Sequence, residues 1–214
     1  MQILTRAVGN ASLPDVPNGL LRRIYAARGV DDGAQLDRSL QALLSPSELP
    51  DIDRAAERLA DAVANGERIL IVGDFDADGA TSVALCMLVL RELGAADADF
   101  LVPNRFEFGY GLSEEIVELA AVDKPDVIVT VDNGVSSIAG VARANTLGID
   151  VIVTDHHLPG AELPDAYALV NPNLQGARFG SRSMAGVGVA YYLLGRLRAV
   201  LRDRGWFESG REMP

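Results

Sequence analysis

Short runs of valine and isoleucine recur along this chain of 214 residues, and each run is followed by a polar turn and then by a helical pattern. These runs show no alternation of apolar and polar residues, which is typical of strands that are buried on both faces. Repeated strand–turn–helix units predict an α/β fold with an open, mainly parallel sheet and helices on both of its faces. The predicted strands cover residues 68–72, 100–102, 127–131 and 151–154, with a further candidate at 166–170.

Helical patterns separate the predicted strands. An amphipathic helix is expected to begin after Asp51 and to end at Asn65-Gly66, where the glycine favours a stop. Residues 1–50 carry two shorter helical signals, at 20–25 and 36–44, which prolines and glycines interrupt. We therefore expect a helical N-terminal arm over 1–50 and a main domain over 51–214. Further helices are predicted over 79–93, 113–122, 135–147 and 185–204.

The composition fits a globular chain with a sizeable core, because 49% of its residues are hydrophobic. No apolar run is long enough to cross a bilayer, and the N-terminus lacks the apolar core of a secretory signal. The expected location is therefore the cytoplasm, with no membrane partner. The single cysteine, Cys86, has apolar neighbours and is expected to be a buried packing residue. The net charge of −11 argues against broad, nonspecific attraction to nucleic acid but allows a local basic site.

Polar residues follow the predicted strands at the point where each strand ends. Because the carboxyl ends of parallel strands meet at one edge of a sheet, we expect these side chains to lie together. Carboxylates crowded into one site repel one another unless a cation holds them, and carboxylates with imidazoles are the ligands of divalent transition metals. The sequence therefore predicts a metal site at this edge, although an aspartate such as Asp132 is also a common helix cap. The residues are Asp74, Asp76 and Asp78; Asn104 and Arg105; Asp132; and Asp155, His156 and His157, which include both histidines of the chain.

Three motifs in this order resemble the DHH phosphoesterase superfamily: Gly-Asp-Phe-Asp-Ala-Asp-Gly at 73–79, Val-Asp-Asn-Gly at 131–134 and Asp-His-His at 155–157. Within that superfamily, the chain is similar to the bacterial RecJ exonucleases, over most of its length and including the arm. The motifs that carry this second likeness are Pro-Asn-Arg at 103–105, Phe-Gly-Tyr-Gly-Leu-Ser at 108–113, Val-Asn-Pro-Asn at 170–173 and Ala-Gly-Val-Gly-Val-Ala at 185–190.

The resemblance implies a site for two divalent ions, Mn²⁺ or Mg²⁺. Asp76 and Asp78 would each hold one ion, Asp132 would bridge the two, and His156 would complete the second. His157 and Asp155 would take part in catalysis by orienting the ligands or contacting a phosphate. The sequence leaves two roles for Asp74, which are to support the metal ligands or to cap the turn that follows it.

Several residues are candidates for binding DNA. The Arg105 guanidinium suits a phosphate, beside Asn104, with an ion pair to Glu107 as its alternative. Gly186 and Gly188 would allow backbone amides to approach a phosphate, or would allow close helix packing. The sequence leaves two roles for the aromatic residues Phe106, Phe108 and Tyr110, which are to stack on bases or to pack against their own loop.

The function implied by the resemblance is that of a metal-dependent phosphodiesterase. It would be a 5′→3′ exonuclease that releases 5′-mononucleotides from single-stranded DNA in repair and recombination. A single-stranded-DNA-binding protein and recombination helicases would be its protein partners. The alternatives are a DHH phosphoesterase for short oligonucleotides or pyrophosphate, and a non-catalytic DNA-binding module. Val72 stands where the pyrophosphatases of the superfamily have a histidine, which disfavours that branch.

The chain departs from the family near its C-terminus. The family takes another aspartate ligand from a segment after the last predicted helix, and residues 205–214 contain none. The further domains of the family, which hold the DNA strand, are also missing. We therefore expect this chain to be an N-terminal piece whose DHH domain is incomplete at its C-terminal end, with weak or no activity by itself.

Overall fold

The computed structural model describes residue 13 and residues 15–207, and the chain divides into two compact units, 1–44 and 45–214. In the first unit, helix α1 (Gly19–Ala27) begins after Asn18, whose side chain accepts hydrogen bonds from two backbone N–H groups. The helix expected over 36–44 was a wrong prediction. This stretch holds the end of the 3₁₀ turn η1 (Gly33–Leu36) and the short turn η2 (Leu40–Ala42). Between them the Asp37 side chain accepts a hydrogen bond from the N–H of Ser39, which competes with a helical bond.

The second unit is built on a five-stranded sheet in the order β2-β1-β3-β4-β5, and every pair of neighbouring strands is parallel. This arrangement confirms the predicted open parallel sheet. Because all the strands run in one direction, their carboxyl ends lie at the same edge of the sheet. The strands are β1 (Ile69–Gly73), β2 (Ala98–Leu101), β3 (Val127–Val131), β4 (Asp150–Thr154) and β5 (Ala168–Val170).

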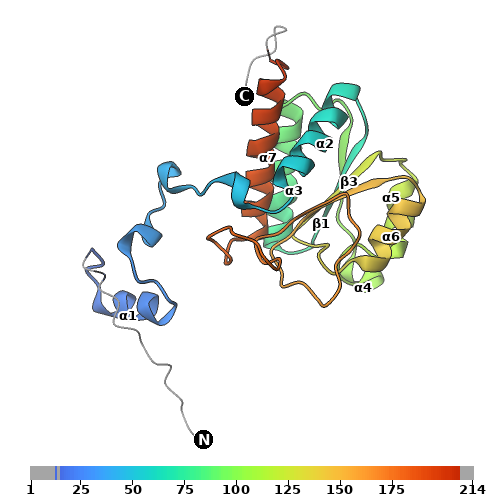
Figure 1. Ribbon diagram of the computed structural model, residues 1–214. Coiled ribbons are helices and arrows are strands. Elements are labelled where there is room, and N and C mark those ends of the chain that lie inside the picture. The colour runs from blue at the N-terminus through green and yellow to red at the C-terminus, as the bar shows by residue number, and fades with distance from the viewer. Residues whose placement is uncertain (1–12, 14, 208–214) are drawn as a thin grey trace, which may run out of the picture. The chain divides into compact units, whose positions relative to one another are not determined.

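Helices cover both faces of the sheet, as predicted (Figure 1). One face carries α2 (Ile52–Asn65), α3 (Ala77–Glu92) and α7 (Gly186–Asp203). The other face carries α5 (Glu114–Ala121) and α6 (Ile138–Thr146). A further short helix, α4 (Arg105–Phe108), follows β2 and was not predicted.

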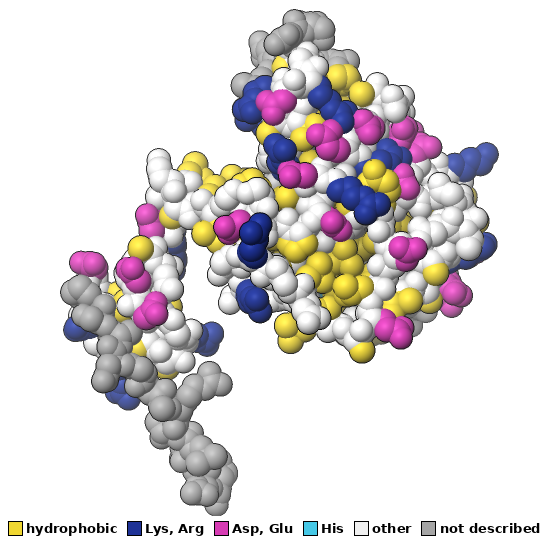
Figure 2. Space-filling view, in the orientation of Figure 1, with side chains coloured by type: hydrophobic (Ala, Val, Ile, Leu, Met, Phe, Trp, Pro, Cys, Tyr) yellow, Lys and Arg dark blue, Asp and Glu magenta, His cyan; other side chains and the backbone are white. Residues whose placement is uncertain are grey.

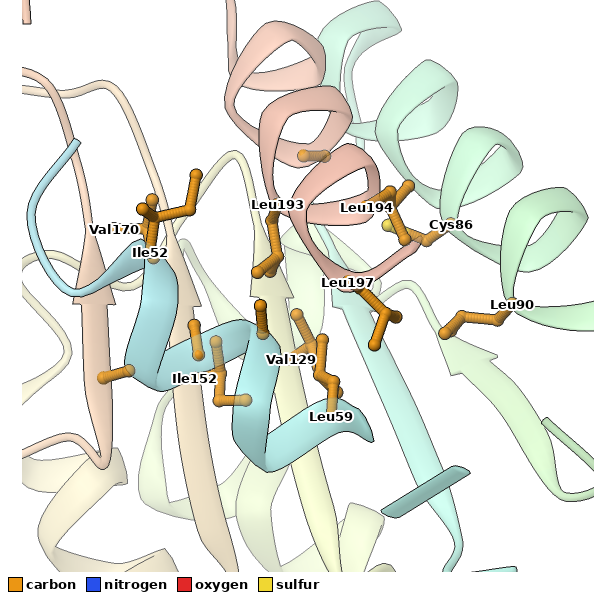
Figure 3. Close-up of a cluster of buried hydrophobic side chains, with 14 of the residues drawn as sticks. Ile52, Leu59, Cys86, Leu90, Val129, Ile152, Val170, Leu193, Leu194 and Leu197 are labelled. Atoms are coloured by element: carbon orange, nitrogen blue, oxygen red, sulfur yellow. The ribbon is translucent and has the colours of Figure 1, made fainter. Parts of the chain in front are cut away.

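The core lies in two layers because the strands alternate their side chains between the two faces of the sheet. Ile69 and Ile71 of β1 face the layer under α2, α3 and α7, whereas Leu70 and Val72 face the layer under α5 and α6. Figure 3 shows the first layer, in which side chains from the three helices meet those of the strands. Cys86 belongs to this layer, and burial raises the pKa of its thiol to about 12, which agrees with its predicted packing role.

The outer surface of α2 and α7 carries ion pairs between the two helices. Arg196 lies 2.6 Å from Asp53, and Arg204 pairs with Asp61 and Glu57. In the view of Figure 2 the basic and acidic side chains of this surface are interspersed, so the described residues show no basic stripe there. Within the described residues, no helix combines the length and the apolar composition that crossing a bilayer requires.

Candidate metal centre

The carboxyl edge of the sheet brings Asp132 together with residues from two other strand ends. One oxygen of Asp132 lies within 4.8 Å of carboxylate oxygens of Asp74 and Asp76, which follow β1. Asp132 also lies within the same distance of ligand nitrogens of His156 and His157, which follow β4. The two groups of potential metal ligands therefore share Asp132, which is the residue that the sequence prediction placed between two ions.

Asp132 is buried, and its surroundings oppose its charge. Its side chain is 2% exposed, and its Oδ1 atom has no hydrogen-bond partner among the described residues, although Nε2 of His156 lies 3.0 Å away. Burial and the nearby charges of Asp78 and Asp76 raise the pKa of Asp132 to about 7. A buried carboxylate oxygen that lies beside an imidazole nitrogen and other carboxylates is a position that suits a cation. The donor set of carboxylates and imidazoles fits a divalent metal ion.

The backbone of Asp132 is strained. Its φ is +62°, in the left-handed region that few residues other than glycine adopt, and aspartate and asparagine tolerate it better than most. The conformation turns the chain directly after β3, where Thr154 at the end of β4 accepts a hydrogen bond from the N–H of Asp132 at 3.0 Å. Strain of this kind is typical of functional sites, where the surrounding structure holds it in place.

The three aspartates after β1 have different surroundings. Asp76 caps α3, and its pKa is lowered chiefly by the N–H of Gly79. Asp78 lies within α3 and accepts hydrogen bonds from the N–H groups of Gly186 at 2.7 Å and Val187 at 2.8 Å. Asp74 is buried and belongs to the same group of potential ligands as Asp76 and Asp132. Its position therefore favours a role beside the metal ligands, which the sequence alone had left open.

Asp155 organises the turn that carries the two histidines. The carboxylate is 1% exposed and accepts hydrogen bonds from the N–H groups of Val135, His156 and His157. Its Oδ1 atom also lies 2.7 Å from Nδ1 of His157. Burial disfavours the charged imidazolium of His157, but the hydrogen bond to Asp155 and its charge outweigh burial and raise the pKa of His157. Asp155 therefore orients His157.

Two asparagines after β5, Asn171 and Asn173, hold the same turn. The sequence indicated them only as part of the Val-Asn-Pro-Asn motif at 170–173. Asn171 donates a hydrogen bond to the carbonyl of His157 at 2.9 Å, and Asn173 donates one to the carbonyl of His156 at 2.6 Å. Their long-range role has no local signal in the sequence, because 14 and 17 residues separate the partners.

The residues predicted to bind DNA have different surroundings. Asn104 caps α4, since its side chain accepts a hydrogen bond from Phe106 N–H and donates one to Glu107. The side chain of Arg105 lies outside the described part of the chain. Gly186 faces Asp132 and Gly188 faces Met184, so both are positions of close packing, and the N–H of Gly186 is bonded to Asp78.

Tyr110 is a residue of the site whose role the sequence left open. Its hydroxyl lies 3.2 Å from Nδ1 of His157 and 3.3 Å from the carbonyl oxygen of Asp132. Burial and the carboxylates of the site, led by Asp155, raise its pKa well above the ordinary value for a tyrosine, so the hydroxyl keeps its proton.

Comparison with known proteins places this geometry in a family. A family model described as the N-terminal domain of the DHH family matches residues 68–208. The single-stranded-DNA-specific exonuclease RecJ of Salmonella typhimurium is 57% identical over 205 residues, which make up 95% of this chain and 35% of that protein. The chain thus spans about a third of the length of this curated relative.

Solved structures agree with this similarity. A crystal structure of exonuclease RecJ bound to manganese matches with a TM-score of 0.68 at 35% identity, and covers 80% of this chain and 41% of that one. The crystal structure of RecJ from Thermus thermophilus in complex with Mn²⁺ has a TM-score of 0.67 at 34% identity, and covers 83% of this chain and 24% of that one.

Proposed function

This chain belongs to the DHH family, and on that premise we propose that it forms the metal-binding part of a single-stranded-DNA-specific exonuclease that uses two divalent ions, Mn²⁺ or Mg²⁺. The observation that carries the proposal is the position of Asp132 in two groups of potential ligands, one with aspartates after β1 and one with histidines after β4. The RecJ structures that resemble this chain contain Mn²⁺, which supports the same ion here.

The ligands of the ions are Asp76, Asp78, Asp132 and His156 in this proposal, and Asp74 is a further oxygen donor. Both oxygens of Asp78 accept amide hydrogen bonds, but each carboxylate oxygen has two lone pairs, so Asp78 can hold an ion at the same time. Asp132 is buried, its Oδ1 atom lies 3.0 Å from Nε2 of His156, and it belongs to both groups of potential ligands, which supports it as a residue that would hold the ions. A pair of bound divalent ions supplies an activated water and stabilises the leaving oxygen of a phosphodiester.

The other residues of the chain position the ligands and the substrate. Asp155 fixes the ring of His157 through Nδ1, which leaves Nε2 as the ring atom that can contact a phosphate oxygen or exchange a proton with one. Arg105 and Asn104 follow β2 in the sequence, and arginine is a residue type that suits the phosphates of the incoming strand. Gly186 lets α7 approach Asp132 closely, whereas Gly188 makes room for the side chain of Met184.

The substrate in this proposal is single-stranded DNA, digested from its 5′ end to mononucleotides. Support comes from the RecJ relatives, whose names describe exonucleases specific for single-stranded DNA. The role is in DNA repair and recombination in the cytoplasm, with a single-stranded-DNA-binding protein and recombination helicases as partners. Because the chain spans 35% of its Salmonella relative, we expect it to be slower alone than when it is joined to the rest of such a protein.

The test is digestion of single-stranded DNA that carries a label at either its 5′ or its 3′ end, in the presence of Mn²⁺. It is run on this chain and on a chimaera that adds the remainder of the Salmonella relative. We expect the chimaera to release the 5′ label first, as a mononucleotide, and Asp132→Asn to abolish the release. Asp123→Asn, an exposed residue at the opposite edge of the sheet, is the matched control. Release from the 3′ end, or hydrolysis of pyrophosphate in preference to DNA, would overturn the proposal.

A further inference from the structure

The hydroxyl of Tyr110 connects two residues of the metal centre that come from different strands. Tyr110 lies in the loop between α4 and α5. Its hydroxyl oxygen is 3.3 Å from the backbone carbonyl oxygen of Asp132, which follows β3, and 3.2 Å from Nδ1 of His157, which follows β4. The hydroxyl oxygen of Tyr110 therefore contacts residues that follow both β3 and β4.

The hydrogen-bond network assigns the protons of this contact. Nδ1 of His157 lies 2.7 Å from a carboxylate oxygen of Asp155, which can only accept when ionised, so Nδ1 carries the ring proton. The oxygen of Tyr110 is the second, longer acceptor for that proton. The proton of Tyr110 itself then points to the carbonyl of Asp132, which has no proton to offer. In this arrangement Nε2 of His157 keeps its lone pair.

The bond to Asp132 supports a strained peptide. With φ at +62°, the backbone of Asp132 stays in its unusual conformation only if its surroundings hold it there. Its N–H is bonded to Thr154, and its carbonyl accepts the bond from Tyr110. Removing the hydroxyl would leave that carbonyl without this donor.

The loop around Tyr110 is shaped to hold the residue in place. Gly109 and Gly111 both have positive φ values, +76° and +79°, which side chains rarely allow. Directly after them, the N–H of the buried Leu112 donates a hydrogen bond to Oγ of Ser137 at 3.0 Å, which ties the loop to the start of α6. The ring of Tyr110 is also one wall of a cavity of about 160 Å³ that Asp155 and His157 line.

We propose that Tyr110 is a positioning residue, whose hydroxyl fixes the His157 imidazole relative to Asp132. It does not need to touch the substrate to do this. The alternative is that the half-exposed ring stacks on a base, as aromatic residues do in many proteins that bind single strands. Positioning depends on the hydroxyl, whereas stacking depends on the ring, so Tyr110→Phe separates the two. The kinetic part of this inference rests on the proposed function, and the spectroscopic part does not.

The first measurement is the ring ¹⁵N spectrum of His157 in the metal-free 214-residue chain, at a pH well above the imidazole pKa. The chain has only two histidines, so the ring signals can be assigned by a His156→Gln variant. Wild type is expected to show a single His157 tautomer with the proton on Nδ1. Tyr110→Phe is expected to leave the proton on Nδ1, because Asp155 still accepts it, but to shift and exchange-broaden the ring signals of His157, because the imidazole loses its second contact. Tyr191→Phe, which makes the same change on the outer surface of α7, is expected to leave the spectrum as in wild type.

The second measurement is the digestion of single-stranded DNA by the chimaera described above. Tyr110→Phe is expected to lower kcat about tenfold, with KM changed by less than about twofold, because the lost bonds orient the site and do not bind the strand. An unchanged His157 spectrum overturns the inference. A raised KM at unchanged kcat also overturns it. If the wild-type chimaera digests no DNA, the proposed function fails, and the spectrum alone decides the positioning role.

Discussion

Gly186 and Asp132 lie so close together that a side chain does not fit between them. A Cβ atom built at position 186 would be 2.5 Å from Oδ1 of Asp132 and 2.8 Å from its Cβ and Cγ atoms. Gly186 is the first residue of α7, and its N–H is bonded to Asp78. The start of α7 is therefore packed directly against the proposed metal ligands, and the glycine is a requirement of the site rather than of the helix.

This contact predicts that Gly186→Ala damages the site. The methyl group would force Asp132 or α7 to move, and we expect a loss of about 2 kcal/mol in the free energy of unfolding, together with weaker Mn²⁺ binding. Gly195→Ala is the matched control, because it lies on the same helix with nothing within 4 Å of its Cβ position. That change is expected to stabilise the chain by about 0.5–1 kcal/mol. Equal effects of the two substitutions, measured by urea unfolding, would contradict the assignment.

The bonds from Asp78 to α7 predict a role in stability as well as in metal binding. Asp78→Ala removes the carboxylate that accepts two N–H groups at the start of the helix, so we expect a loss of about 2–3 kcal/mol in metal-free protein. Asp78→Asn keeps one acceptor oxygen, so its loss should be smaller although the charge is gone. Asp53→Ala, which removes an exposed ion pair, should change stability by no more than about 0.5 kcal/mol. A loss for Asp78→Ala no greater than that of Asp53→Ala would argue against the capping role.

The raised pKa of Asp132 predicts how the stability of the metal-free chain depends on pH. The folded state binds the Asp132 proton more tightly than the unfolded state does, because the pKa is about 7 in the fold and 3.8 as the ordinary value. Stability from this group is therefore fully present below about pH 4 and is lost as pH rises towards 7, with a slope of at most about 1.4 kcal/mol per pH unit. Asp132→Asn should remove that slope and stabilise the metal-free chain near neutral pH, because asparagine also tolerates the positive φ.

The measurement is the difference between the unfolding free energies of wild type and Asp132→Asn across this pH range. Groups away from the site titrate in both proteins and cancel in the difference, whereas His157 and Asp76, whose pKa values depend on Asp132, contribute to it together with Asp132. Asp123→Asn, which lies away from the site, should show no such difference. A constant difference for Asp132→Asn would mean that the carboxylate is already ionised at low pH.

The strands and the edge of the sheet could be predicted from the sequence because their signals are local. The apolar runs of β1, β3 and β4 fixed the strands to within a residue or two, and the polar residues after them had to meet once the sheet was parallel. The arm was less predictable. Apolar residues at 36–44 look helical in isolation, but η1 ends at Asp37, whose side chain accepts a hydrogen bond from the N–H of Ser39, the residue that precedes η2.

The remaining features depend on partners that are far apart in the sequence. Asp78 meets Gly186 and Val187 across 108 and 109 residues, and Tyr110 meets Asp132 and His157 across 22 and 47 residues. Asp51 precedes α2 as predicted, but its side chain bonds the N–H of Leu169 in β5 instead of capping the helix. No local sequence pattern predicts such contacts, because the same residue types also occur as caps of turns or exposed to solvent.

Calorimetric titration of Mn²⁺ into this chain tests the central claim most directly, because it needs neither DNA nor any further segment. The account predicts saturable binding to wild type that falls at least tenfold in Asp132→Asn, the residue shared by both groups of ligands, and that is unchanged in Asp123→Asn. Mn²⁺ binding that Asp132→Asn leaves unaltered, or no binding by the wild-type chain, would contradict it.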